Sequence, residues 1–110
     1  MNYEVFITQT AEADLSEALD YIEFVLLNPQ AAANLLDKSA EAFKALSQYA
    51  MRHGLINDPV LMARDIRFMP IDNYLAFYTI DEKTHVVSII RFLYAKRNWI
   101  GILKGGLPLN

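Results

Sequence analysis

The feature that most constrains the fold is a proline that divides one long helical pattern into two. Between about residues 10 and 50, apolar side chains recur at steps of three and four, the spacing of a buried stripe on an amphipathic helix. Pro29 cannot continue the first helix, because its ring blocks the hydrogen-bond ladder, but it fits the first turn of a second. Asn28-Pro29 therefore predicts a tight connection in an antiparallel helical hairpin. The two predicted stripes are Leu15, Ala18, Leu19, Ile22, Val25 and Leu26, and then Ala32, Leu35, Leu36, Ser39, Ala42, Phe43, Leu46 and Ala50.

Short strands account for the rest of the regular pattern. Side chains at residues 3–8 alternate between two faces with a period of two, which predicts a short strand. Thr10 is a candidate N-terminal cap for the helix that follows. Met51 to Pro59 has the composition of a loop. Three further strand-like runs follow, separated by connections of hairpin length, which predicts an antiparallel meander. These runs lie at about 63–69, 74–80 and 85–94.

The order of these elements predicts an α+β fold, β-α-α-β-β-β, with the helical hairpin packed on one face of a small antiparallel sheet. At 110 residues we expect a single domain spanning 1–110. Its predicted parts are the hairpin at about 10–50, the meander at about 63–94 and a tail at 95–110. Since both helices cover one face, the opposite face is the candidate functional surface.

Residues 86–99, VVSIIRFLYAKRNW, join an apolar strand to a short basic and aromatic tail. Strict alternation along the strand predicts two faces. One face would carry His85, Val87, Ile89 and Arg91, and the other Val86, Ser88, Ile90 and Phe92. The apolar residues after Trp99 predict either a helix packed on the domain or an exposed interaction patch.

Several classes of site are excluded or disfavoured by the composition. The chain has no cysteine, and His53 and His85 are 32 positions apart, so we expect neither a metal site nor a cofactor. It shows no signal-peptide pattern and no run of 18 apolar residues. We therefore expect a cytoplasmic protein without membrane contact.

Charge is divided unevenly along the chain. Residues 1–60 carry nine acids and three basic residues, a balance of −6, whereas residues 61–110 carry four acids and seven basic residues, a balance of +3. The basic half supplies one candidate patch, in which arginine suits phosphate or carboxylate and aromatic rings suit unpaired bases. It contains Arg64, Arg67, Arg91, Lys96 and Arg97 among Tyr74, Tyr78, Tyr94 and Trp99. Single-stranded RNA and a protein rim both fit this patch. A purely structural interpretation is that Arg91 pairs with an acid and the tyrosines pack across strands.

Four segments in order resemble the RelE/ParE toxin superfamily of type II toxin–antitoxin modules. They are Ala13-Asp14-Leu15 with Tyr21-Ile22, then Asn28-Pro29-Gln30-Ala31-Ala32, then residues 67–78 as RFMPIDNYLAFY, and residues 90–99 as IRFLYAKRNW. The resemblance spans nearly the whole chain. The Asp-Leu and Asn-Pro-x-Ala-Ala elements favour the ParE-like branch, although Ala95 and Asn98 depart from its usual tail.

The resemblance implies a toxin that arrests growth unless a cognate antitoxin neutralises it, with a toxin–antitoxin heterotetramer as an expected complex. The ParE-like branch implies inhibition of DNA gyrase. The RelE-like alternative is ribosome-dependent, metal-independent mRNA cleavage, and a third is a decayed toxin that only binds its antitoxin. The candidate catalytic residues are Arg67, Arg91, Tyr94 and Arg97, with His85 as a further candidate for proton transfer. The candidate target-binding residues are Arg64, Lys96 and Trp99.

Overall fold

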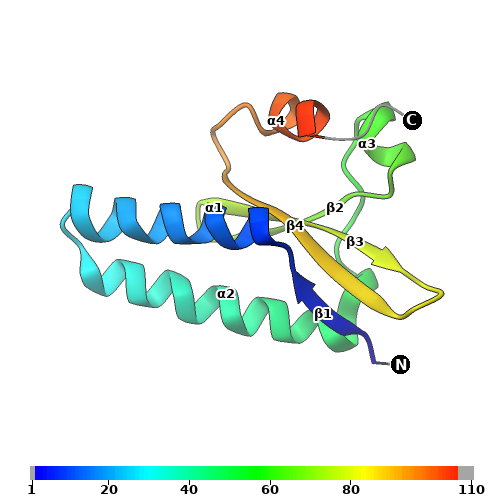
Figure 1. The fold of residues 1–110 in the computed structure, drawn as a ribbon, viewed down its shortest axis with the longest axis horizontal. Coiled ribbons are helices and arrows are strands. Elements are labelled where there is room, and N and C mark those ends of the chain that lie inside the picture. The colour runs from blue at the N-terminus through cyan, green and yellow to red at the C-terminus, as the bar shows by residue number, and fades with distance from the viewer. Residues whose placement is uncertain (1, 107–110) are drawn as a thin grey trace.

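A four-stranded sheet in the order β1-β4-β3-β2 forms the centre of the computed structural model, which describes residues 2–106 (Figure 1). Its three later strands form the predicted antiparallel meander. The strands are β1 (Glu4–Ile7), β2 (Arg67–Ile71), β3 (Tyr74–Asp81) and β4 (Val86–Tyr94). β1 pairs with β4 in parallel, so the complete sheet is mixed. The predicted α+β fold and its main order of elements are confirmed.

The helical hairpin consists of α1 (Gln9–Asp20), a π-helical turn (Tyr21–Val25) and α2 (Pro29–Tyr49). The side chain of Thr8, rather than the predicted Thr10, caps α1 by accepting from the backbone N–H of Ala11. Asn28 caps α2 in the same way, with Pro29 in its first turn as predicted. A 3₁₀ turn (Ala50–Arg52) then leads α2 into the following loop.

The hairpin packs on one face of the sheet and forms the larger core with it. Tyr78, Val87, Ile89 and Phe92 supply its sheet side, against Leu35, Phe43 and Leu46 from α2. Tyr78 is completely buried, and its hydroxyl donates to the carbonyl oxygen of Ala50 at 2.8 Å. This core confirms that the apolar stripes face the sheet along most of the hairpin.

A β-bulge in β4 overturns the predicted faces of that strand. Phe77 pairs with Arg91 and Tyr78 pairs with Ile89, so Ile90 is an extra residue with no partner in the register. Val87 and Ile89 therefore share the hairpin side with Phe92. Arg91 lies opposite Phe77, whose ring belongs to the second core. Strict alternation fails because one inserted residue inverts every later side chain.

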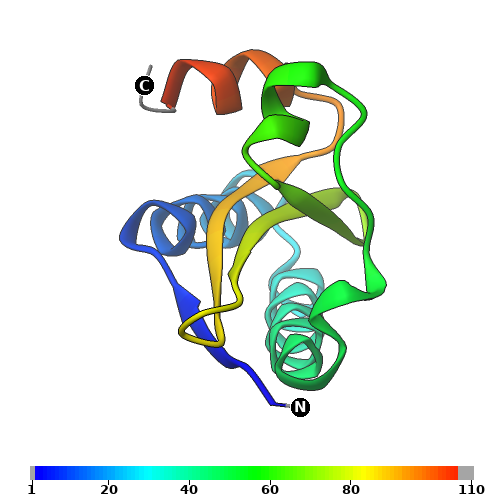
Figure 2. The same cartoon turned by 90° about the vertical axis from the view of Figure 1, so that its right-hand side faces the viewer.

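Two short helices cover the other face of the sheet, on the side away from the hairpin (Figure 2). They are α3 (Pro59–Ala63) and α4 (Trp99–Gly106). The predicted loop therefore ends in a helix, and the predicted strand at 63–69 begins only at Arg67. Leu61 from α3 and Leu103 from α4 are buried against Phe77 and Leu93. The described part of the tail is thus a packed helix, and the predicted functional face is largely covered. Residues 107–110 of the predicted tail lie outside the described residues.

Candidate functional site

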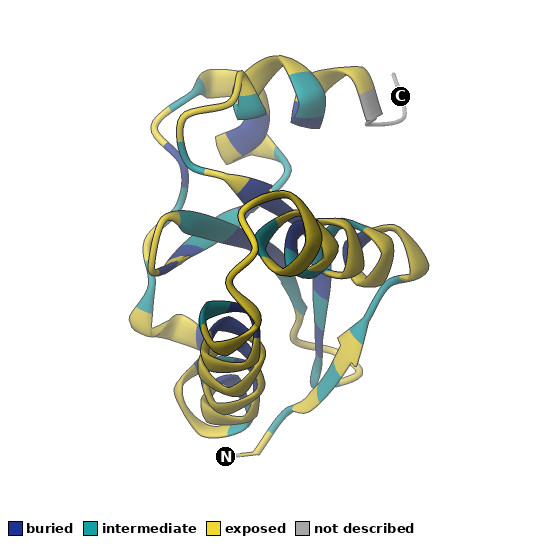
Figure 3. Ribbon diagram, turned by 90° about the vertical axis from the view of Figure 1, so that its left-hand side faces the viewer, coloured by how far each residue is buried: buried dark blue, intermediate teal, exposed yellow. Residues whose placement is uncertain are grey.

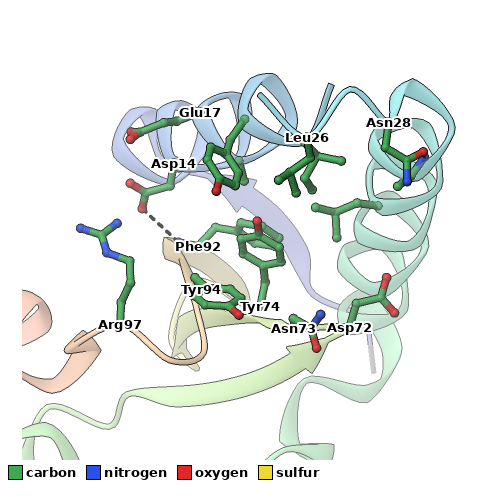
Figure 4. Close-up of a pocket in the computed structure, with 15 residues that line it drawn as sticks. Asp14, Glu17, Leu26, Asn28, Asp72, Asn73, Tyr74, Phe92, Tyr94 and Arg97 are labelled. Carbon is green, nitrogen blue, oxygen red and sulfur yellow. Dashed lines mark hydrogen bonds between the residues drawn. The ribbon is translucent and has the colours of Figure 1, made fainter. Parts of the chain in front are cut away.

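The hairpin extends beyond the end of the sheet (Figure 1), and a hollow lies between the two, with its lining drawn in Figure 4. It is an open groove of about 670 Å³ between α1, α2 and the ends of β3 and β4. Aromatic and aliphatic side chains line most of it, with carboxylates at its edge. The lining residues are Asp14, Glu17, Ala18, Tyr21, Ile22, Leu26, Asn28, Ala31, Leu35, Asp72, Asn73, Tyr74, Phe92, Tyr94 and Arg97.

Aromatic rings form the sheet side of this groove. The ring of Tyr74 stacks on Phe92, with centroids 5.2 Å apart and planes 12° apart. Tyr94 meets Tyr74 edge to face at 5.6 Å. Partial burial, followed by the nearby hydroxyls of Tyr94 and Tyr21, raises the pKa of Tyr74 above its ordinary value. Tyr74 is therefore neutral near pH 7, and this surface offers ring faces and hydroxyl groups to a ligand.

Three carboxylates surround the rings. Asp14 is the most buried of them and is already engaged, because it binds Arg91 and accepts from the backbone N–H of Phe92 at 3.0 Å. Asp72 pairs with Lys38 at 3.0 Å, but both side chains are about half exposed, so this pair contributes little stability. Glu17 is an exposed member of the lining on α1. Two of the three carboxylates at the edge of the aromatic surface thus already have a cationic partner within the chain.

The two candidate arginines of the strands do not come together. Arg91 makes a two-point ion pair with Asp14, with its Nε 2.7 Å from Oδ2 and its Nη2 3.0 Å from Oδ1. Arg67 donates from Nη1 to the backbone carbonyl oxygen of His53 at 2.6 Å. Cross-strand partners share a face, so Arg67 lies with Tyr78 on the hairpin side, whereas Arg91 lies with Phe77 on the other. Both guanidinium groups therefore have internal partners, and the register separates them across the sheet.

The candidates of the tail are divided between the groove and the second core. Tyr94 and Arg97 line the groove together, and Figure 4 shows Arg97 at the end near Asp14 and Glu17. Lys96 is exposed. Trp99 packs its ring against Phe77 at 5.4 Å and is partly buried in the second core.

The other candidates lie elsewhere. Arg64 is half-buried at the end of α3 and makes an interaction of its own. His85, the further candidate for proton transfer, stacks on Tyr3 at 5.4 Å next to β1. Its side chain is not part of the groove lining.

The tip of the hairpin is a surface that the sequence reading missed. Here we define it as Tyr21, Phe24, Val25, Leu26 and Leu27, whose side chains are between 51% and 80% exposed. Figure 3, which looks at this end of the molecule, shows both helices exposed where they pass the sheet. The predicted stripe had placed Val25 and Leu26 inside, and Leu36 on α2 is exposed too. Helical spacing identifies an apolar face but cannot say where the opposing sheet ends.

Leu27 adds a backbone feature at this tip. Its φ is 53°, in the left-handed region where glycine or asparagine is usual, and its side chain is 80% exposed. Such a conformation costs an L-residue roughly 1–2 kcal/mol. An exposed leucine in this position gains no burial within the chain to offset that cost.

Within residues 2–106, no three His, Asp or Glu side chains are arranged to hold a metal ion. None of the described helices is both long and apolar enough to cross a membrane.

Solved structures with the same fold come from toxin–antitoxin systems. One, described as a chromosomal ParDE TA system from P. aeruginosa, has a TM-score of 0.68 and 20% identity, covering 86% of this chain and 97% of that chain. Another, the toxin–antitoxin complex RelBE2 from Mycobacterium tuberculosis, has a TM-score of 0.59 and 23% identity, covering 86% and 99%. A comparison with curated protein sequences finds no similar protein. The fold of this chain is thus one that it shares with small α+β proteins found in such systems.

The sequence places the chain more narrowly within that class. Residues 5–99 match the family model described as the ParE toxin of type II toxin–antitoxin system, parDE. The chain belongs to this ParE toxin family, and it is the toxin component of a type II toxin–antitoxin system. The ParE-like branch favoured by the early sequence elements is confirmed.

Proposed function

We propose that this toxin arrests growth in the cytoplasm by binding DNA gyrase, and that a cognate antitoxin neutralises it by forming a complex with it. The observation that carries the proposal is that Arg67 in β2 and Arg91 in β4 are both bound by groups of the toxin itself. A ribonuclease of this type needs cations aimed at a phosphate, together with a general acid and a general base. Here Asp14 holds Arg91, and the carbonyl of His53 holds Arg67. Membership of the ParE family supports gyrase as the protein target.

A specific observation favours the alternative, RelE-like cleavage of mRNA. Tyr94 and Arg97 line one groove, and Lys96 is exposed beside them, so a hydroxyl and cations lie near each other. If RNA were cleaved here, the Tyr94 hydroxyl would be the group that transfers the proton. A toxin that binds gyrase through the same surface needs the ring of Tyr94 rather than its hydroxyl.

The test is a side-by-side assay of the purified toxin on gyrase supercoiling and on mRNA in translating ribosomes. We expect loss of supercoiling with intact transcripts, and Tyr94→Phe should retain this inhibition. Fragmented transcripts with normal supercoiling, abolished by Tyr94→Phe, would establish the ribonuclease instead. Binding of the antitoxin with neither effect would identify a decayed toxin. Light scattering of the complex made with antitoxin tests the heterotetramer, which we expect to contain two copies of each chain.

A further inference from the structure

The hairpin tip lies past the end of the sheet and exposes apolar side chains to solvent (Figures 1 and 3). Phe24 and Leu27 are its most exposed members, at 66% and 80%, and neither of them lines the groove. Exposed aromatic and aliphatic side chains gathered in one place are typical of the centre of a protein–protein interface. The tip therefore offers an apolar surface of its own, which meets the groove at Tyr21 and Leu26.

The backbone of the tip adopts two uncommon conformations. Tyr21–Val25 form a π-helical turn, a feature that is frequent at functional sites. Leu27 then takes up its left-handed φ, while the N–H of Asn28 donates to the carbonyl oxygen of Ile22 at 3.0 Å. Glycine is the usual residue in this conformation at the end of a helix. A leucine here makes folding less favourable and gains no burial in return, so its side chain points to a use outside the chain.

Acidic side chains without internal partners border the tip. Asp20 and Glu23 are exposed, and within residues 2–106 neither carboxylate has a hydrogen bond or an ion pair. They differ in this respect from Asp14 and Asp72, which pair with cations of the same chain. No lysine or arginine precedes Lys38 in the sequence. A partner that covers the tip is therefore favoured if its apolar contact surface has basic side chains at the rim.

This charge separates the candidate partners. In a symmetric pair of toxins, the carboxylates at the tip would face their own copies, which is unfavourable. A membrane surface rich in anionic lipids would repel the same carboxylates. An enzyme that acts on DNA, by contrast, needs basic surface to bind a polyanion. Gyrase, the proposed target, is thus the partner whose charge complements the tip.

We propose that this toxin binds gyrase through the hairpin tip, with Phe24 and Leu27 entering an apolar pocket whose rim is basic. Asp20 and Glu23 face that rim. This inference rests on the proposed function, because it takes gyrase as the target. It assigns the contact to the acidic half of the chain, whereas the candidate target-binding residues named from the sequence lie in the basic half.

The test measures the affinity of toxin variants for purified gyrase holoenzyme by surface plasmon resonance, together with inhibition of supercoiling. Phe24→Ala should weaken binding about tenfold. Phe6→Ala is the matched control and should bind within about twofold of the parent, because Phe6 is 57% exposed on β1, at the other end of α1. Leu27→Asn should weaken binding about tenfold while raising the urea midpoint of unfolding, since asparagine tolerates the left-handed region.

Charge supplies a second comparison. The double variant Asp20→Asn, Glu23→Gln should weaken gyrase binding about threefold at low salt, and by less at high salt, because exposed charges are screened. The matched control is Asp37→Asn, Glu41→Gln, which removes two exposed acids from α2 outside the tip. Its affinity for gyrase should stay within about twofold of the parent.

Binding of the antitoxin from the neighbouring gene is measured in parallel. Unchanged gyrase affinity in both Phe24→Ala and Leu27→Asn would overturn the inference and leave gyrase as the target. Weakened antitoxin binding in these variants, with gyrase affinity unchanged, would assign the tip to the antitoxin instead. A lowered urea midpoint in Leu27→Asn would show that the leucine serves the fold. No binding of the parent toxin to gyrase would overturn the proposed function itself.

Discussion

Asp14 and Arg91, 77 positions apart in the sequence, form a two-point ion pair that ties α1 to the end of β4. Their side chains are 11% and 25% exposed, so much of the pair is shielded from water. Asp14 also accepts from the backbone N–H of Phe92. β1 pairs with β4 only as far as Ile89. Beyond that point the Asp14 carboxylate, rather than a strand, is the partner of the β4 backbone. This ion pair gives the arginine of β4 a partner within the chain.

The first prediction concerns the strength of this pair. Arg91→Ala leaves a partly buried carboxylate without its cation, so we expect the free energy of unfolding to fall by about 2 kcal/mol. In a double-mutant cycle with Asp14→Ala, urea unfolding should give a coupling energy of about 1–2 kcal/mol. Strictly additive losses would show that the pair contributes nothing. If Arg91 also contacts the target, Arg91→Ala should reduce toxicity more than Asp14→Ala does at equal amounts of folded protein.

The second prediction is a pH dependence due to His53. Burial, followed by the nearby charge of Arg52, lowers the pKa of His53 below its ordinary value of 6.5. The unfolded chain therefore takes up a proton on this ring before the folded chain does. Stability should be constant above that range and should fall as the pH drops below about 6.5 toward the lower folded pKa. Urea midpoints measured across this window should show the slope, and His53→Gln should reduce it; an unchanged slope in that variant would contradict the assignment.

The third prediction uses an unpaired hydroxyl. Ser39 lies in α2 with no exposed surface, and among the described side chains its Oγ is a buried polar atom without a hydrogen-bond partner. Ser39→Ala removes this hydroxyl and favours the helix, so the free energy of unfolding should rise by about 1 kcal/mol. Ser47→Ala is the matched control, because Ser47 lies in the same helix and donates to the carbonyl of Lys44. An equal gain in both variants would show that helix propensity alone is responsible.

The fourth prediction concerns the layer made by α3 and α4. Asp58 accepts from the N–H groups of Val60 and Leu61, and its carboxylate lies 2.9 Å from Nζ of Lys104. Lys104, followed by the N–H of Leu61, lowers the pKa of Asp58 below its ordinary value of 3.8. The contribution of this carboxylate is thus complete above that value and is lost as the pH falls through the lower folded pKa.

Loss of Asp58 should loosen α4 specifically. We expect Asp58→Ala to speed limited proteolysis and amide exchange within residues 99–106, and Asp58→Asn, which keeps the helix cap, to have a smaller effect. Lys104→Ala should resemble Asp58→Asn. Equal protection of α4 in all three variants would mean that burial of Leu103 alone holds the helix.

Local signals predicted the hairpin and the meander well. Pro29 and the apolar spacing define two helices through their own backbone and side-chain chemistry, and the strands are separated by short turns. Two errors have one cause in common. The bulge at Ile90 and the helix at α3 depend on contacts with distant elements, which periodicity within a short window cannot contain. The groove was missed for the same reason, since its lining comes from α1, α2, β3, β4 and the segment after β4.

By itself the sequence determined the family and the order of the elements, because these follow from residue types and spacings along one chain. Only the tertiary structure decided what each candidate residue contacts. An arginine in a strand is equally suited to phosphate and to a carboxylate, and the partner is chosen by what the fold places beside it. Here the fold places Asp14 against Arg91, and it leaves Tyr94 and Arg97 at an open groove. Because the hairpin is longer than the sheet that it covers, the part of its apolar stripe that lies past the end of the sheet is exposed.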